Sequence, residues 1–260
     1  MSSVTARISA VKQPTGGYIK PSQFEAHKID DGQVLNEAEN VHASIMGMVV
    51  DYLTRFMMGT DVVEAFSISC KGAVIAEQMF KQTGTIKKAD KFLSNIKGLD
   101  DTSIISACKM VTYDVWFRNP IGAMMAKGAD DTNPDADTVQ NVKIMVERSM
   151  AFWKEYGPVV KDGFTFEPNG YTETVDSGDG DYLTADTLWD FKVTKSKPSS
   201  KHTLQLLMYW IMGQHSGQEI YKDIKKLGIF NPRLNIVYLM DINKVSAEVI
   251  AEVEKDIICY

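Results

Sequence analysis

Hydrophobic residues recur at helical spacing through most of the first 156 residues. Between residues 41 and 58 they stand at Val41, Ile45, Met48 and Tyr52, close to the 3.6-residue period of an α-helix. The polar run that begins at Gly59 ends this pattern. Similar spacing predicts helices over residues 63–83, 88–96, 102–116 and 139–156. Residues 1–40 carry frequent Pro, Gly and charged residues, and they are predicted to form an irregular N-terminal arm or an extended edge.

The pattern changes to short alternating segments after Gly157. Two strands are expected over residues 164–166 and 171–175, with a turn at 168–170 between them, and a second strand pair over 181–184 and 187–194. A helix over 202–212, a strand over 234–240 and a helix over 246–258 follow. With one earlier helix the order is α-βββ-α-β, which predicts an α/β fold. We expect residues 1–260 to form a single domain, with a helical insertion over 60–140 and the central sheet over 158–240.

Composition and charge exclude several classes of protein. The chain has 260 residues, 44% hydrophobic and 24% charged, and a net charge of −6, which are ordinary values for a globular protein. The longest apolar runs are too short to span a bilayer, so no membrane partner is expected. The three cysteines contain no CxxC pair, which argues against a zinc ribbon, an iron–sulfur cluster or a disulfide framework. Residues 1–12 lack a secretory signal, and together these features predict a cytoplasmic protein.

The most informative chemistry lies in the second predicted strand pair. If residues 185–186 form a two-residue turn, Asp181 faces Asp190 across the hairpin, and Lys192 follows on the same face as Asp190. Two opposed carboxylates repel each other unless a cation lies between them. Mg²⁺ and Mn²⁺ prefer such oxygen ligands. We therefore expect Asp181 and Asp190 to be metal ligands and catalytic residues, with Lys192 positioning or activating a water molecule.

Two alternatives remain for this hairpin. It is either a metal site or a solvated hairpin with scattered charges, because a D-x-K triplet alone is common. Asp179 is the alternative to Asp181 as the acid that faces Asp190, since a β-bulge at Gly180 would put Asp179 in that position.

The helix predicted after the hairpin carries a polar stripe. His202, Gln205 and Tyr209 stand at positions i, i+3 and i+7, so they share one side of the helix. The stripe is either a supporting or nucleic-acid-binding surface, or the polar side of an ordinary amphipathic helix. Four lysines stand within ten residues between the hairpin and the helix, and they form either a phosphate-binding loop or a solvated one; they are Lys192, Lys195, Lys197 and Lys201.

These motifs together resemble the PD-(D/E)XK nuclease superfamily, and its RecB-like and lambda-exonuclease-like branches most closely. Asp181 followed by Asp190-Phe191-Lys192 matches the central motif, and the spacing of Gln205 and Tyr209 matches the Q-x-x-x-Y motif of the RecB-like branch. The resemblance covers residues 157–240 and one upstream helix. It implies a restriction-endonuclease-like core, a mixed central sheet flanked by helices, and hydrolysis of DNA phosphodiester bonds with Mg²⁺ or Mn²⁺.

The family resemblance also implies a metal ligand upstream of the sheet. RecB-like relatives often carry G-x-x-x-H on the first helix, where this chain has Gly47 and Asp51, so Asp51 is either an oxygen ligand or a surface residue. Lambda-exonuclease-like relatives use a glutamate on a helix before the sheet, for which Glu147 is the candidate and Glu77 a weaker one. The remaining histidines His27 and His42 are expected at the surface.

The expected function is thus a metal-dependent deoxyribonuclease with DNA as its partner, and an exonuclease of phage or recombination type is preferred. The choice between exonuclease and endonuclease is left open, as are the choice between single-stranded DNA, double-stranded DNA and RNA and a homo-oligomer that would suit processive digestion. One alternative is a catalytically inactive nuclease-fold protein that binds nucleic acid or a protein. Another is a helical partner-binding protein built on residues 41–156, since the chain has 14 methionines.

Overall fold

The computed structural model describes residues 2–260, and the chain divides into two compact units. One unit contains the residues up to Ile29 together with Trp153–Tyr260, and the other contains Asp30–Phe152. The first is built around a β-sheet, and the second is helical. Helix α9 (Ala136–Tyr156) begins in the helical unit and ends in the sheet unit.

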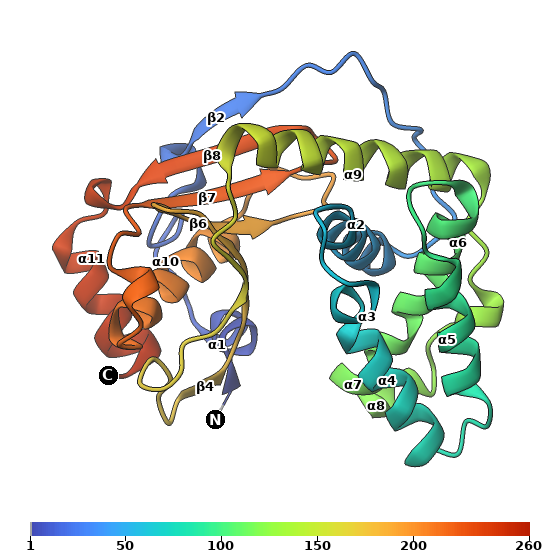
Figure 1. Ribbon diagram of the computed structural model, residues 1–260. Coiled ribbons are helices and arrows are strands. Elements are labelled where there is room, and N and C mark those ends of the chain that lie inside the picture. The colour runs from blue at the N-terminus through green and yellow to red at the C-terminus, as the bar shows by residue number, and fades with distance from the viewer. Residues whose placement is uncertain (1) are drawn as a thin grey trace. The chain divides into compact units, whose positions relative to one another are not determined.

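A mixed six-stranded sheet forms the centre of the first unit, in the order β2-β8-β7-β6-β5-β3 (Figure 1). Strands β6 and β7 run parallel, and every other neighbouring pair is antiparallel. A parallel pair needs a crossover connection, which here is helix α10 (Ser200–His215). The structure confirms the predicted α/β class. The sheet strands are β2 (Glu25–Lys28), β3 (Lys161–Phe164), β5 (Gly180–Leu183), β6 (Thr187–Phe191), β7 (Lys226–Asn231) and β8 (Ile236–Asp241).

The two faces of the sheet are buried by different partners. Leu183 and Leu188 share a hydrophobic core with the apolar side chains of α10. The alternate residues of the same strands join a cluster of aromatic rings, in which Trp153 stacks on Phe191 with ring centroids 5.5 Å apart. Every residue of β6 is buried, as expected for a strand covered on both faces. The cluster also contains Tyr182, Trp189 and Phe230.

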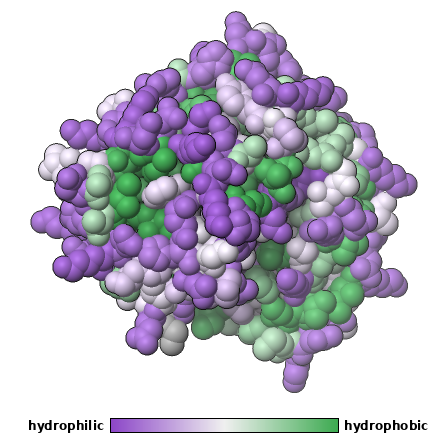
Figure 2. Space-filling model, turned by 60° about the vertical axis from the view of Figure 1, so that its left-hand side comes forward, coloured by the Kyte–Doolittle hydropathy of each residue, from purple (hydrophilic) through white to green (hydrophobic). Residues whose placement is uncertain are grey.

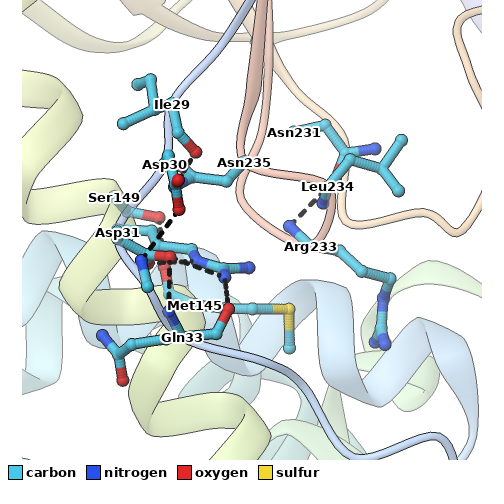
Figure 3. Close-up of polar contacts among 12 residues, drawn as sticks. Ile29, Asp30, Asp31, Gln33, Met145, Ser149, Asn231, Arg233, Leu234 and Asn235 are labelled. Atoms are coloured by element: carbon cyan, nitrogen blue, oxygen red, sulfur yellow. Dashed lines mark hydrogen bonds and ion pairs between the residues drawn. The ribbon is translucent and has the colours of Figure 1, made fainter.

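The N-terminal segment is more ordered than its sequence predicted. Strand β1 (Ser2–Ser3) pairs in parallel with β4 (Val175–Ser177), and helix α1 (Val4–Ala10) packs on α10 with Val4 and Ile8 buried. Strand β2, also within the expected irregular arm, pairs with β8. Asn235, which precedes β8, holds the residue after β2, because its side-chain amide donates to the carbonyl of Ile29 at 2.9 Å (Figure 3). The expected extended edge is therefore present as β2, at one edge of the sheet, whereas the expectation of an irregular arm was wrong for α1, which packs on α10.

The first predicted strand pair is also different in the structure. Strand β3 pairs with β5, and β4 pairs with β1, so the two do not form a hairpin with each other. Strand β7 was not predicted, and the closing helix is α11 (Ala247–Glu252), continued by a π-helical turn over Val253–Ile258.

The second unit confirms most of the predicted helices. The expected segment 41–58 is α2, and the expected helix over 102–116 is interrupted by a 3-10 turn at Val111–Tyr113. Arg148 donates to both carboxylate oxygens of Asp31, at 2.7 and 3.1 Å, and to the carbonyl of Gln33 (Figure 3). These hydrogen bonds lower the pKa of Asp31. The helices are α2 (Ala43–Met57), α3 (Val62–Ala65), α4 (Ser67–Gln78), α5 (Thr85–Asn95), α6 (Asp101–Met110), α7 (Asp114–Arg118), α8 (Pro120–Ala123) and most of α9.

The surface in view in Figure 2 is mostly hydrophilic, and its hydrophobic side chains gather in separate patches. Scattered apolar residues of this kind are normal on a folded protein. No helix within residues 2–260 combines the length and apolar character needed to cross a bilayer.

A glycine in β7 gives a test of the aromatic face. A Cβ atom at Gly228 would lie 2.3 Å from the Trp189 ring, so Gly228→Ala forces that ring to move. We expect the free energy of unfolding, measured by chemical denaturation, to fall by about 1–3 kcal/mol. Gly128→Ala is the matched control, because no atom lies within 4 Å of its Cβ position. Equal stability of the two variants would contradict tight packing of Trp189 on β7.

Candidate functional site

The β5–β6 hairpin has the predicted register. The pairs are Tyr182–Trp189 and Leu183–Leu188, and the N–H of Thr184 donates to the carbonyl of Thr187 at 3.0 Å across the turn. One further step along this antiparallel register places Asp181 opposite Asp190.

Asp181 is fixed by a hydrogen bond across the hairpin. Its Oδ2 accepts from the backbone N–H of Phe191 at 2.7 Å, so its carboxylate lies beside the backbone that follows Asp190. The β3–β5 register is regular from Leu183 to Gly180, without a bulge, and Asp179 is exposed. The structure therefore brings Asp181, and not Asp179, to the end of the hairpin.

Asp190 is the most unusual residue of the site. It is only 3% exposed, and its Oδ1 accepts from Nζ of Lys192 at 2.8 Å. Its Oδ2 is also buried, and no hydrogen-bond donor among residues 2–260 reaches it. A buried carboxylate oxygen without a partner is costly, so a cation or a donor from outside the chain would be favoured there.

Lys192 is held as an ammonium ion between the acids. Burial lowers its pKa, but the negative charges of Asp190 and Asp181 outweigh this effect and leave the pKa raised. The ammonium group forms an ion pair with Oδ1 of Asp190, next to the buried Oδ2 that has no donor among residues 2–260.

Helix α10 turns its polar stripe toward these charges. The amide of Gln205 donates to the hydroxyl of Tyr209 at 2.8 Å, and Tyr209 is 4% exposed. Burial raises the pKa of Tyr209, the hydrogen bond from Gln205 lowers it, and the carboxylates of Asp190, Asp181 and Asp179 raise it further, so the phenol keeps its proton. Burial lowers the pKa of His202, Lys192 lowers it further, and Asp190 acts in the opposite direction, so His202 is also within electrostatic reach of the hairpin.

The other expected site residues are the three additional lysines and the two upstream acids, and all five lie outside the β5–β6 hairpin. The additional lysines Lys195, Lys197 and Lys201 are exposed, on the loop before α10 and on its first turn. Asp51 and Glu147 belong to the helical unit, where Asp51 accepts from Nε of Arg55 at 3.0 Å.

Three weaker or rejected candidates also have clear positions. Glu77 accepts from the backbone N–H of Ile86 at 2.8 Å, which is a structural role at the start of α5. His27 and His42 are exposed, as predicted.

Two residues that support the site were missed, Val4 of the N-terminal segment and Tyr171. Val4 of α1 lies so close to Gly178 that a Cβ there would approach it to 2.8 Å, and the hydroxyl of Tyr171 donates to the Gly178 carbonyl at 2.6 Å. Both contacts hold the loop that leads to Asp181. The available signal was the pair Val4 and Ile8, apolar residues four apart.

The donor set fits a hard divalent cation with few protein ligands. Within residues 2–260 no group of three His, Cys, Asp or Glu side chains is arranged to hold a metal. Mg²⁺ commonly uses only one or two carboxylates and keeps several waters. Asp181 and the free oxygen of Asp190 match that requirement, with the remaining positions left for water and a substrate oxygen.

The site is thus two carboxylates and an ammonium group on neighbouring strands, beside a glutamine–tyrosine pair. Comparison with protein-family models, curated proteins and solved structures finds no match to the chain. Its function is therefore inferred from the geometry of this site.

Removal of the ammonium group tests the electrostatics without reference to activity. Lys192→Met leaves the buried carboxylate of Asp190 without its ion-pair partner, and we expect a loss of about 2–4 kcal/mol in the free energy of unfolding in EDTA. Adding Asp190→Asn should restore much of that loss, because the buried charge is then removed. Chemical denaturation measures both effects, with Lys197→Met as the exposed control. A double variant no more stable than Lys192→Met would show that the buried charge of Asp190 is not the cause of the loss.

Proposed function

We propose that the protein is a Mg²⁺- or Mn²⁺-dependent deoxyribonuclease that hydrolyses DNA phosphodiester bonds. The observation that carries this proposal is the buried, unpartnered Oδ2 of Asp190, next to the ammonium group of Lys192 and opposite Asp181. An acid pair with one oxygen left open is suited to a metal ion, and a lysine beside it is suited to a phosphate group.

The order of elements supports a nuclease of the PD-(D/E)XK type. Helix α9 is followed by β3, β5 and β6 of the sheet, then by α10 and β7. This is the α-βββ-α-β order of a restriction-endonuclease-like core. The candidate acids stand at the start of β5 and the end of β6, and α10 brings the Q-x-x-x-Y pair next to them.

Each side chain has a role in this proposal. A cation held by Asp181 and Asp190 would lower the pKa of a bound water and stabilise charge on the phosphate oxygens. Lys192 would orient the attacking water and offset the charge that grows on the phosphate. Tyr209, kept protonated and oriented by Gln205, is a neutral donor for the DNA backbone, while the exposed lysines Lys195, Lys197 and Lys201 attract it.

We further propose an exonuclease of phage or recombination type that acts on DNA in the cytoplasm. The resemblance of the motifs to RecB-like and lambda-exonuclease-like enzymes supports this assignment. The stripe on α10 supports a backbone-binding role that does not depend on base sequence.

Cleavage of labelled DNA tests the proposal directly. Linear and circular DNA, single- and double-stranded, is incubated with Mg²⁺, Mn²⁺ or EDTA. We expect metal-dependent cutting of linear DNA that falls by at least about 100-fold in Asp190→Ala, because the metal loses its buried ligand. Asp176→Ala, which changes an exposed acid on β4, should keep full activity. No cutting by folded wild-type protein would refute the nuclease and favour an inactive nuclease-fold protein that binds nucleic acid or a protein.

Metal binding is tested separately from cleavage. Mn²⁺ at about 100 times its Kd should stabilise the wild-type protein by about 2.7 kcal/mol, seen as a raised Tm. Asp190→Asn should lose most of that stabilisation, whereas Asp176→Asn should keep it. An equal rise in Tm for both variants would place the bound cation elsewhere.

A further inference from the structure

The orientation of the His202 ring is set by the start of α10. Ser199 and His202 form a capping box, in which Nδ1 of His202 accepts from the backbone N–H of Ser199 at 3.2 Å. A backbone N–H can only donate, so Nδ1 carries no proton. The proton of the neutral imidazole is therefore on Nε2, at the far side of the ring from Ser199.

The surroundings of His202 also favour the neutral ring. Burial and the positive charge of Lys192 lower its pKa, against an opposite effect of Asp190. The capping hydrogen bond acts in the same direction, because a protonated Nδ1 could not accept it.

His202 lies close enough to the candidate site for the charges of Lys192 and Asp190 to act on its ring. His202 stands on the polar stripe with Gln205 and Tyr209, and the charged groups that affect it are Lys192 and Asp190. No group within residues 2–260 accepts a hydrogen bond from Nε2. The structure thus orients a neutral N–H donor that the protein itself does not use.

We propose that His202 binds the substrate, with Nε2–H donating to a non-bridging oxygen of a DNA phosphodiester group. This inference rests on the proposed nuclease function and adds a substrate contact to it. A neutral donor is suited to this position because a second cation next to Lys192 would be repelled. His202 therefore differs from the exposed lysines, which bind phosphates by charge and release counterions.

Loss of a neutral donor should weaken DNA binding without changing its salt dependence, and unfolding of the variant would not produce that result. A fluorescein-labelled 20-nucleotide DNA, single- or double-stranded, is titrated with protein in Ca²⁺ and followed by anisotropy over a range of salt concentrations. We expect His202→Phe to weaken binding by about 10- to 100-fold, with the slope of log K against log salt unchanged. Lys201→Ala should reduce that slope, because it removes a charged contact.

His42 provides the matched control for the lost helix cap. Its Nδ1 accepts from the backbone N–H of Ser44 at 3.3 Å at the start of α2, so His42→Phe removes a similar capping bond. We expect His42→Phe to bind DNA like the wild type. Equal binding by His202→Phe and the wild type, or an equal loss in His42→Phe, would overturn the proposal.

The tautomer is measured on the wild-type chain, so it does not depend on a folded variant. Nitrogen NMR of the ¹⁵N-histidine-labelled protein should show His202 protonated at Nε2 alone, and the Nε2 signal should shift when the DNA is added with Ca²⁺. A proton on Nδ1, or an Nε2 signal unaffected by DNA, would refute the inference. Wild-type protein that binds DNA through His202 without cutting it in Mg²⁺ or Mn²⁺ would disprove the nuclease and leave this contact standing.

Discussion

A buried carboxylate oxygen of Asp190, at one end of the β5–β6 hairpin, has no hydrogen-bond donor among the described residues. Lys192 engages Oδ1 of Asp190, and Asp181 is held by the N–H of Phe191, so the second oxygen of Asp190 is left buried and without a donor. A buried carboxylate oxygen without a partner is unfavourable, and a cation or a hydrogen-bond donor from outside the chain would remove that cost. The candidate chemistry of the protein follows from this open oxygen of Asp190.

The fold imposes this arrangement through its topology. Because β6 and β7 are parallel, the chain must cross from one end of the sheet to the other, and α10 makes that crossing over the face that carries the acids. The same helix supplies His202, Gln205 and Tyr209 to the site. Trp153 and its aromatic neighbours bury the opposite face, which makes β6 a central strand with no solvent on either side.

Local patterns predicted a large part of these elements. The helices of the second unit follow from apolar spacing, and the hairpin register follows from a two-residue turn at 185–186. Strand β2 lay beyond prediction because its four residues are all exposed and its order comes from pairing with β8. Strand β7 contains a glycine that packs on Trp189, so its role appears only once its neighbour is known. Pairing of β1 with β4 joins segments more than 170 residues apart.

The sequence by itself determined which groups could meet, because side-chain alternation in a strand and the stripe of a helix are local properties. It predicted Asp181, Asp190 and Lys192 on one hairpin, and His202, Gln205 and Tyr209 on one side of the next helix. Only the tertiary structure decided that Asp190 is buried with an open oxygen, that Asp181 rather than Asp179 stands opposite Asp190, and that Nε2 of His202 makes no hydrogen bond within residues 2–260. Burial and hydrogen-bond partners depend on segments distant in the chain, and no local pattern records them.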